Sequence, residues 1–195
     1  MTRVVHKFTR RVPEWQPRLV PVKLEEATLE QLDALKVTPS NTKVSDYVLT
    51  LAHDVESLSV RSSLFNAIMY DRGGMSREER ELGALAASMV NRCIYCAAVH
   101  ADRHAKLAKD ETVTDELFAN GDEADLSPRN RAIFDFARKA AEAPPSAGPE
   151  DIDKLSKAGL SDEEIFDLIL SSSLFGWANR LMHVLGDPVT RRETA

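Results

Sequence analysis

Apolar residues recur at helical spacing through most of this 195-residue chain, and this periodicity restricts the fold more than any other feature. Leu82, Leu85, Ala86 and Met89 stand at positions i, i+3, i+4 and i+7, which places them on one face of a helix. Only eight residues are glycine, and no segment shows sustained strand-type alternation flanked by hairpin turn signals. The pattern predicts an all-α fold, a single-domain helical bundle.

Start and stop signals divide the periodic runs into about seven or eight helices. Ser76 and Ser161 each precede a glutamate by three residues, as in a capping box, and Ser127 directly precedes a proline. Asn91 is expected to cap the helix that follows it. The expected helices cover residues 28–37, 43–55, 57–71, 76–90, 92–109, 128–143, 149–158 and 162–185.

The N-terminal segment differs in composition from the rest of the chain. Basic residues dominate residues 1–23, where Glu14 is the single acidic residue, and Pro13, Pro17 and Pro21 favour extended backbone. We therefore expect an extended basic arm over residues 1–27, a helical domain over residues 28–188 and a C-terminal tail over residues 189–195. The arm is expected to pack on the acidic body of its own chain or on a neighbouring subunit.

Charge and hydropathy exclude several classes of protein. A net charge of -6 argues against nucleic acid as the main partner, because phosphate binding needs clustered lysine and arginine. No apolar stretch is long enough to cross a bilayer, and charges and prolines interrupt residues 1–23, where a signal peptide would have its apolar region. Two cysteines cannot supply a secreted disulfide framework. We expect a cytoplasmic protein that binds neither nucleic acid nor a membrane.

The two cysteines form a single C-x-x-C motif, Cys93 and Cys96, with His100 four residues later. Residues of a helix advance by about 100° each, so the three side chains project from one face, and His104 extends this stripe by one turn. The first turn of a helix favours a thiolate, and a histidine on the same face can accept the thiol proton. The motif predicts reversible dithiol–disulfide chemistry.

Other interpretations of the motif remain open at this point. The cysteines could be core residues, since free cysteine is among the most buried residue types. They could also bind zinc with His100 and either Glu81 or His104, although no second C-x-x-C is present to complete a structural zinc site. A thioredoxin-like protein is excluded because its C-x-x-C needs a βαβ unit.

The segments around these residues resemble the alkylhydroperoxidase D-like family of the carboxymuconolactone decarboxylase-like superfamily. Thiol members of that family carry a glutamate, eleven residues, C-x-x-C, three residues and a histidine, and Glu81, Cys93, Cys96 and His100 fit this spacing. Residues 125–137, 159–165 and 179–186 also resemble its peroxidase-related subfamily. The likeness covers roughly residues 40–188 and leaves out the N-terminal arm.

The resemblance implies a helical peroxidase without metal or organic cofactor. In this family the second cysteine, here Cys96, attacks the hydroperoxide and becomes a sulfenic acid. Cys93 then condenses with it to a disulfide, and an external dithiol reductant restores both thiols. Glu81 and His100 would form the proton relay. Members commonly form trimers or hexamers, so a homo-oligomer is expected.

One position departs from the best-known members, which carry a histidine just before the second cysteine. Tyr95 stands there and cannot serve as a base near neutral pH, since the pKa of tyrosine is about 10. We therefore do not assign the reductant of those members to this chain. No role is assigned to His104 or His183. The alternatives to a peroxidase are a redox sensor, a dithiol–disulfide oxidoreductase, a lactone decarboxylase and a zinc-binding structural protein.

Overall fold

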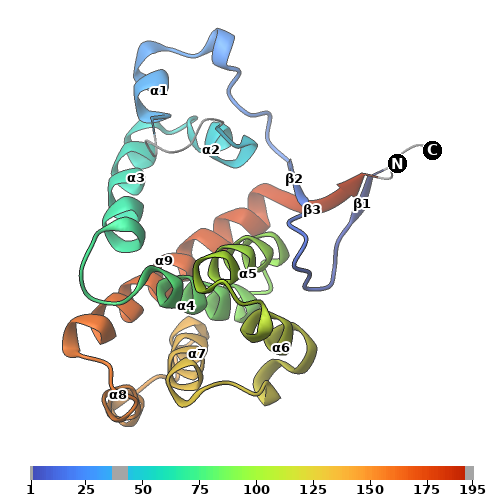
Figure 1. Cartoon of the computed structure of the whole chain (residues 1–195). Coiled ribbons are helices and arrows are strands. Elements are labelled where there is room, and N and C mark those ends of the chain that lie inside the picture. The colour runs from blue at the N-terminus through green and yellow to red at the C-terminus, as the bar shows by residue number, and fades with distance from the viewer. Residues whose placement is uncertain (1, 37–43, 192–195) are drawn as a thin grey trace.

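The computed structural model describes residues 2–36 and 44–191 and confirms a predominantly helical fold (Figure 1). Within these ranges the helices are α1 (Leu29–Ala34), α2 (Asp46–Leu51), α3 (Val55–Tyr70), α4 (Arg77–Val90), α5 (Ile94–Ala108), α6 (Thr112–Asn120), α7 (Pro128–Ala141), α8 (Pro149–Lys157) and α9 (Asp162–Leu185). Short 3₁₀ helices form at Leu24–Glu26 and Gly121–Glu123. The strands are β1 (Thr2–Val4), β2 (Glu14–Pro17) and β3 (Gly186–Arg191).

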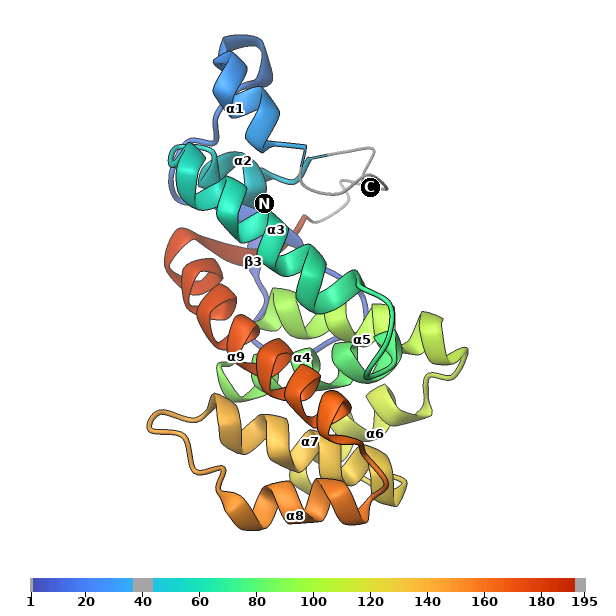
Figure 2. The same ribbon diagram turned by 90° about the vertical axis from the view of Figure 1, so that its left-hand side faces the viewer.

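Helix α4 lies at the centre of the fold, where it contacts α5, α7 and α9. Its buried residues include several small ones, and Ala84, Ala86 and Ala87 are completely inaccessible to solvent. Short side chains let the neighbouring helices approach closely, and burying their apolar surface stabilises the fold. Helices α7 and α8 lie at one end of the molecule and α1 and α2 at the other, with α3 and α9 between them (Figure 2).

The packing of α4 on α9 requires a glycine at position 83. A Cβ added to Gly83 would lie 2.7 Å from Cδ1 of Leu168, whose side chain is completely buried. We expect Gly83→Ala to lower the free energy of unfolding by about 1–3 kcal/mol through overpacking, measured by urea denaturation. Gly176→Ala is the matched control, because its Cβ would meet only the end of the Arg180 side chain, at 3.4 Å. Equal losses in both variants would contradict this account.

The predicted helix starts are largely confirmed. Ser161 forms a capping box with Glu164, and Ser127 accepts a hydrogen bond from the backbone of Asn130 ahead of a proline in the first turn. Ser76 also caps its helix by accepting a bond from the Glu79 N–H. The carboxylate of Glu79 does not return to the backbone of Ser76, because it pairs instead with a guanidinium of α7.

Three short strands form a sheet that the sequence did not predict. β3 is the central strand, and β1 and β2 pair with it in antiparallel register, so that Thr2 faces Arg191 and Trp15 faces Pro188. The strands have three, four and six residues. Alternation cannot identify strands this short, and their pairing joins opposite ends of the chain. For these reasons the sequence analysis found no strands, and that expectation was wrong.

The basic arm packs on the body of its own chain through this sheet. Arg18 donates hydrogen bonds to the carbonyl oxygens of His183 and Val184 at the end of α9 and pairs with Asp187 at 2.6 Å. A cation at a helix C-terminus satisfies the last carbonyl groups and the negative end of the helix dipole. Arg10 similarly pairs with Asp115 of α6 at 2.8 Å. Charge complementarity therefore holds the arm in place.

The arm also supports the wall of a cavity. The Trp15 ring passes so close to Gly186 that an added Cβ would lie 2.4 Å from the ring. On its other side the ring meets Tyr47 edge-on, with the ring centroids 5.5 Å apart. Tyr47 lines the cavity described below, so the sheet positions one side of the candidate site.

Several helix boundaries differ from those expected. Helix α6 was missed because its nine residues contain Thr112, Val113 and Thr114, which have low helix propensity. Helix α2 is shorter than the expected 43–55 because Ser45 caps it, and residues 37 and 43 of two expected helices lie outside the described residues. Strand β3 includes residues 189–191 of the expected tail, and residues 192–195 lie outside the described residues. No helix in the described ranges has the length and apolar character needed to span a membrane.

Candidate functional site

The C-x-x-C motif lies at a sharp break between α4 and α5. Asn91 ends α4, so the prediction that it caps the following helix was wrong. Its carbonyl oxygen lies 2.5 Å from Nε2 of His183, which ties the break to α9. Arg92 turns the chain with a positive φ of 54°, and Cys93 becomes the N-cap residue of α5. Cys96 therefore occupies the first turn, where the helix dipole favours a thiolate.

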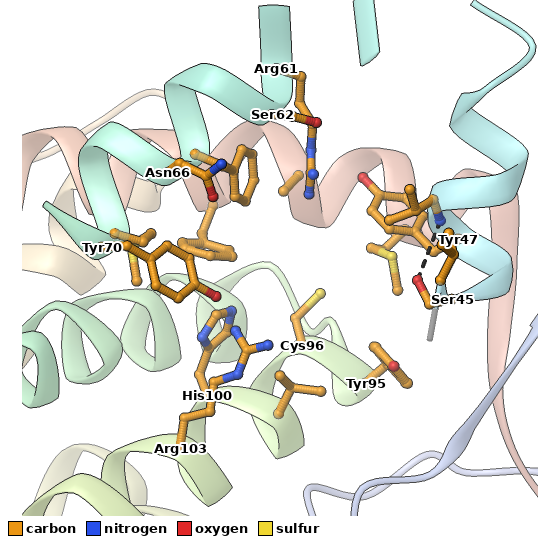
Figure 3. Close-up of a pocket in the computed structure, with 18 residues that line it drawn as sticks. Ser45, Tyr47, Arg61, Ser62, Asn66, Tyr70, Tyr95, Cys96, His100 and Arg103 are labelled. Atoms are coloured by element: carbon orange, nitrogen blue, oxygen red, sulfur yellow. Dashed lines mark hydrogen bonds between the residues drawn. The ribbon is translucent and has the colours of Figure 1, made fainter. Parts of the chain in front are cut away.

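The two cysteines are joined as a disulfide, with their Cα atoms 5.3 Å apart. Both side chains are buried, but their surroundings differ. Both pack in an apolar cluster with Trp15, Tyr47 and Met182, whereas only Cys96 lines a cavity of about 240 Å³ (Figure 3). A small molecule entering the cavity would therefore meet the sulfur of Cys96 first.

Glu81 and His100 form a buried pair beside this motif. The Nδ1–H of His100 donates to Oε2 of Glu81 at 2.5 Å, and the carboxylate is completely inaccessible to solvent. Arg77 donates two hydrogen bonds to Oε1 of Glu81, at 3.0 and 2.5 Å. The Arg103 guanidinium lies 3.9 Å from the same oxygen. The turn at Asn91 brings α4 and α5 together, which is how residues 19 positions apart meet.

The surroundings of this pair keep the carboxyl ionised. Burial by itself raises the pKa of Glu81, but His100, Arg103 and Arg77 together lower it to about 2. Burial lowers the pKa of His100, whose ring also packs edge-on against Phe175 with centroids 4.1 Å apart. A neutral imidazole whose Nδ1–H is held by a carboxylate has Nε2 as its acceptor, so His100 can receive a proton from the cavity.

Helix α3 supplies the wall of the cavity opposite the cysteines. Arg61, Ser62, Asn66 and Tyr70 project from one of its faces toward α5, as Figure 3 shows, and Phe65 of the same helix also lines the cavity. Sequence analysis did not select these residues. Their helical spacing places polar and aromatic side chains on the same face of α3. A helix face of this mixed kind was the sequence signal that could have identified the cavity wall.

Three residues considered in the sequence analysis have identifiable surroundings. Tyr95 lines the cavity and burial raises the pKa of its hydroxyl, which agrees with its exclusion as a base. His104 is buried, and its Nδ1 donates to the carbonyl oxygen of Glu78 at 2.9 Å. His183 bonds the carbonyl at the end of α4 rather than the cavity. Among the described residues, no three histidine, cysteine, aspartate or glutamate side chains gather in an arrangement suited to a metal ion.

Comparison with known protein families identifies a match to the segment that contains this site. Residues 56–139 match the carboxymuconolactone decarboxylase family, a segment that contains Glu81, both cysteines and His100. This segment includes helices α4 and α5 and the site between them, and the predicted resemblance to the alkylhydroperoxidase D-like branch of this superfamily is confirmed. A sequence comparison with curated proteins gives no significant match.

Solved structures make the relationship more specific. The chain is similar to the alkylhydroperoxidase AhpD core of an uncharacterized peroxidase-related protein from Ralstonia eutropha JMP134, with 29% identity and a TM-score of 0.76 over 87% of this chain and 90% of that one. An uncharacterized peroxidase-related protein from Silicibacter sp. TM1040 shares the fold, with 24% identity and a TM-score of 0.73 over 90% and 94% of the two chains.

The same fold also occurs in a protein with another reaction. The debrominase Bmp8 has 17% identity and a TM-score of 0.72 over 86% of this chain and 89% of its own. The fold alone therefore does not define the reaction, which has to be argued from the residues of the site.

Proposed function

We propose that this protein is a thiol-dependent peroxidase that reduces small hydroperoxides through the Cys93–Cys96 pair. The observation that supports it most is the cavity shared by Cys96 and His100, with Glu81 behind the imidazole. A nucleophilic thiol, a base and a group that orients the base are the parts that thiolate chemistry requires. The similarity to proteins named as peroxidase-related points in the same direction.

In the first step, His100 takes the proton of the Cys96 thiol. The thiolate attacks the terminal oxygen of the hydroperoxide, an S–O bond forms and the O–O bond breaks. The leaving alkoxide takes a proton from the His100 imidazolium and departs as an alcohol. Cys96 is oxidised by two electrons to a sulfenic acid, and the hydroperoxide is reduced by two electrons.

In the second step, the Cys93 thiol attacks the sulfur of the Cys96 sulfenic acid. The disulfide forms and the hydroxyl leaves as water, taking the Cys93 proton. An external dithiol then reduces the disulfide and is itself oxidised, which returns both thiols. One cycle converts a hydroperoxide and a dithiol into an alcohol, water and an oxidised dithiol.

We propose that the protein works in a reducing compartment such as the cytoplasm, because the cycle needs a dithiol donor. A homo-oligomer, a trimer or hexamer, stays a prediction. Among the apolar residues of α9, Leu168 and Phe175 are buried within the chain's own core, whereas Trp177 is 45% exposed and is available for a subunit contact.

The test is hydroperoxide consumption by the reduced protein with dithiothreitol. Hydrogen peroxide, tert-butyl hydroperoxide and cumene hydroperoxide are compared, and the alcohol products are quantified. We expect many equivalents of at least one organic hydroperoxide to be reduced per protein, and no catalysis by the variant in which both cysteines are serine. Consumption that stops at one equivalent with dithiothreitol present would contradict a peroxidase and favour a redox sensor.

A further inference from the structure

Arg61 is the feature of the cavity that the thiol mechanism does not use. It projects from α3 into the space that contains Cys96 (Figure 3). Its guanidinium lies over the ring of Phe65, with Cζ 3.8 Å from that ring's centroid and 6.0 Å from the ring centroid of Tyr47. Its Nε is buried without a hydrogen-bond acceptor in the described part of the chain.

This arrangement differs from those of Arg80 and Arg77, which both pair with carboxylates. The Arg80 guanidinium bonds the carboxylate of Asp167 at 2.8 Å, and Arg77 bonds Glu81. No ion pair in residues 2–36 and 44–191 involves Arg61, and no aspartate or glutamate is among the described residues that line the cavity. Arg61 is half-buried, and withdrawing an unpaired charge from water is costly, so an anionic ligand in the cavity would supply the partner that the chain does not.

Tyr47 supplies a second donor to the same space. Its hydroxyl is buried without a hydrogen-bond partner among the described residues, and it faces the cavity from α2 (Figure 3). Burial raises the pKa of Tyr47 to about 12, so the hydroxyl keeps its proton and can donate it. The rest of the wall mixes apolar side chains such as Met69 and Val99 with polar ones, among them Ser62, Asn66 and Arg103, which lies 3.9 Å from the Glu81 carboxylate.

Resting on the function proposed above, we propose that Arg61 and Tyr47 bind the carboxylate of the substrate, so that the enzyme reduces small organic hydroperoxides that carry a carboxylate. The planar guanidinium matches a carboxylate in geometry, and one unpaired cation matches a monoanion in charge. The volume of about 240 Å³ lies below the roughly 300–1,000 Å³ of sites for drug-sized ligands, which favours a short substrate.

The binding test is independent of peroxidase turnover. It uses the full chain with both cysteines replaced by serine, and titrates 4-methylpentanoate and the neutral 4-methylpentanamide by calorimetry. We expect the carboxylate to bind at least about tenfold more tightly than the amide, and Arg61→Met to remove this preference. Tyr47→Phe, which deletes only the hydroxyl, is expected to weaken carboxylate binding severalfold. Lys106→Met, which removes a cation from the exposed surface of α5, is the control for net charge.

The kinetic test compares 4-hydroperoxy-4-methylpentanoate with its methyl ester, using the enzyme with intact cysteines. Arg61→Met is expected to lower kcat/KM for the acid by about 10- to 100-fold and to change that for the ester by less than threefold. Arg61→Lys should recover part of the loss, since it restores the charge without the planar fork.

The outcomes separate the two proposals. Equal affinity for the carboxylate and the amide, or carboxylate binding unchanged in both Arg61→Met and Tyr47→Phe, would overturn the carboxylate site whatever the peroxidase assay gives. Carboxylate binding that depends on Arg61 in a protein that reduces no hydroperoxide would support the site and overturn the peroxidase.

Discussion

Replacing Cys96 with serine is expected to abolish the reaction with hydroperoxide, whereas replacing Cys93 with serine leaves one reduction per protein molecule. The cavity reaches the sulfur of Cys96 and not that of Cys93. A serine hydroxyl is not ionised near neutral pH, so Cys96→Ser should react at least about 10³-fold more slowly. Cys93→Ser should reduce one equivalent without added dithiol and then stop, because no second thiol resolves the sulfenic acid.

The measurement is stoichiometric consumption of tert-butyl hydroperoxide by the reduced variants, followed by trapping of the sulfenic acid with dimedone and mass spectrometry. Because the chain has only two cysteines, the variant with two serines gives the background without any thiol. A dimedone adduct on Cys93 in the Cys96→Ser variant, with none on Cys96 in the other, would reverse the assigned roles.

The second large effect is expected from Glu81→Gln. A neutral amide stabilises the His100 imidazolium less than the carboxylate does, and hydrogen bonds to charged groups contribute about 1.5–3 kcal/mol. This corresponds to an increase of about one to two units in the apparent pKa of the Cys96 thiol. The rate with hydroperoxide at pH 7 should fall by about 10²-fold, as expected for loss of general acid–base assistance, and recover in part at higher pH.

Thiol alkylation of the reduced protein as a function of pH measures this shift directly. Glu78→Gln, three residues earlier on α4, makes the same chemical change outside the pair and should leave the alkylation profile unchanged. If the two variants have the same profile as the unmodified protein, Glu81 is not part of the proton relay.

The same substitution should also change how the free energy of unfolding depends on pH. The pKa of Glu81 is about 2 in the folded chain against an ordinary 4.5. Its contribution is therefore fully present above the ordinary value and is lost as the pH falls toward about 2, because the unfolded chain takes up the proton first. Between about pH 5 and pH 2, the unmodified protein should lose about 3 kcal/mol more of its free energy of unfolding than Glu81→Gln loses.

Local signals in the sequence predicted most of the helices and part of the site. Ser161 and Ser127 start helices where expected, since a cap acts on backbone groups within the same turn. The stripe of Cys96 and His100 follows from helical geometry, and both residues line the cavity. Glu81 was assigned to the proton relay only through the family spacing, because a lone glutamate on a helix resembles a solvated surface charge until its burial is known.

The sequence by itself determined the helical class, the C-x-x-C motif and the family resemblance, because these depend on residues within a few turns of one another. Only the tertiary structure paired β1 and β2 with β3, placed Glu81 against His100 across the break at Asn91, and brought Arg61 of α3 over the cavity. Those arrangements result from packing and charge pairing between segments distant in the chain, which no local pattern encodes. The proposed preference for carboxylates therefore depends on the tertiary structure, whereas the proposed thiol chemistry was predicted from the sequence.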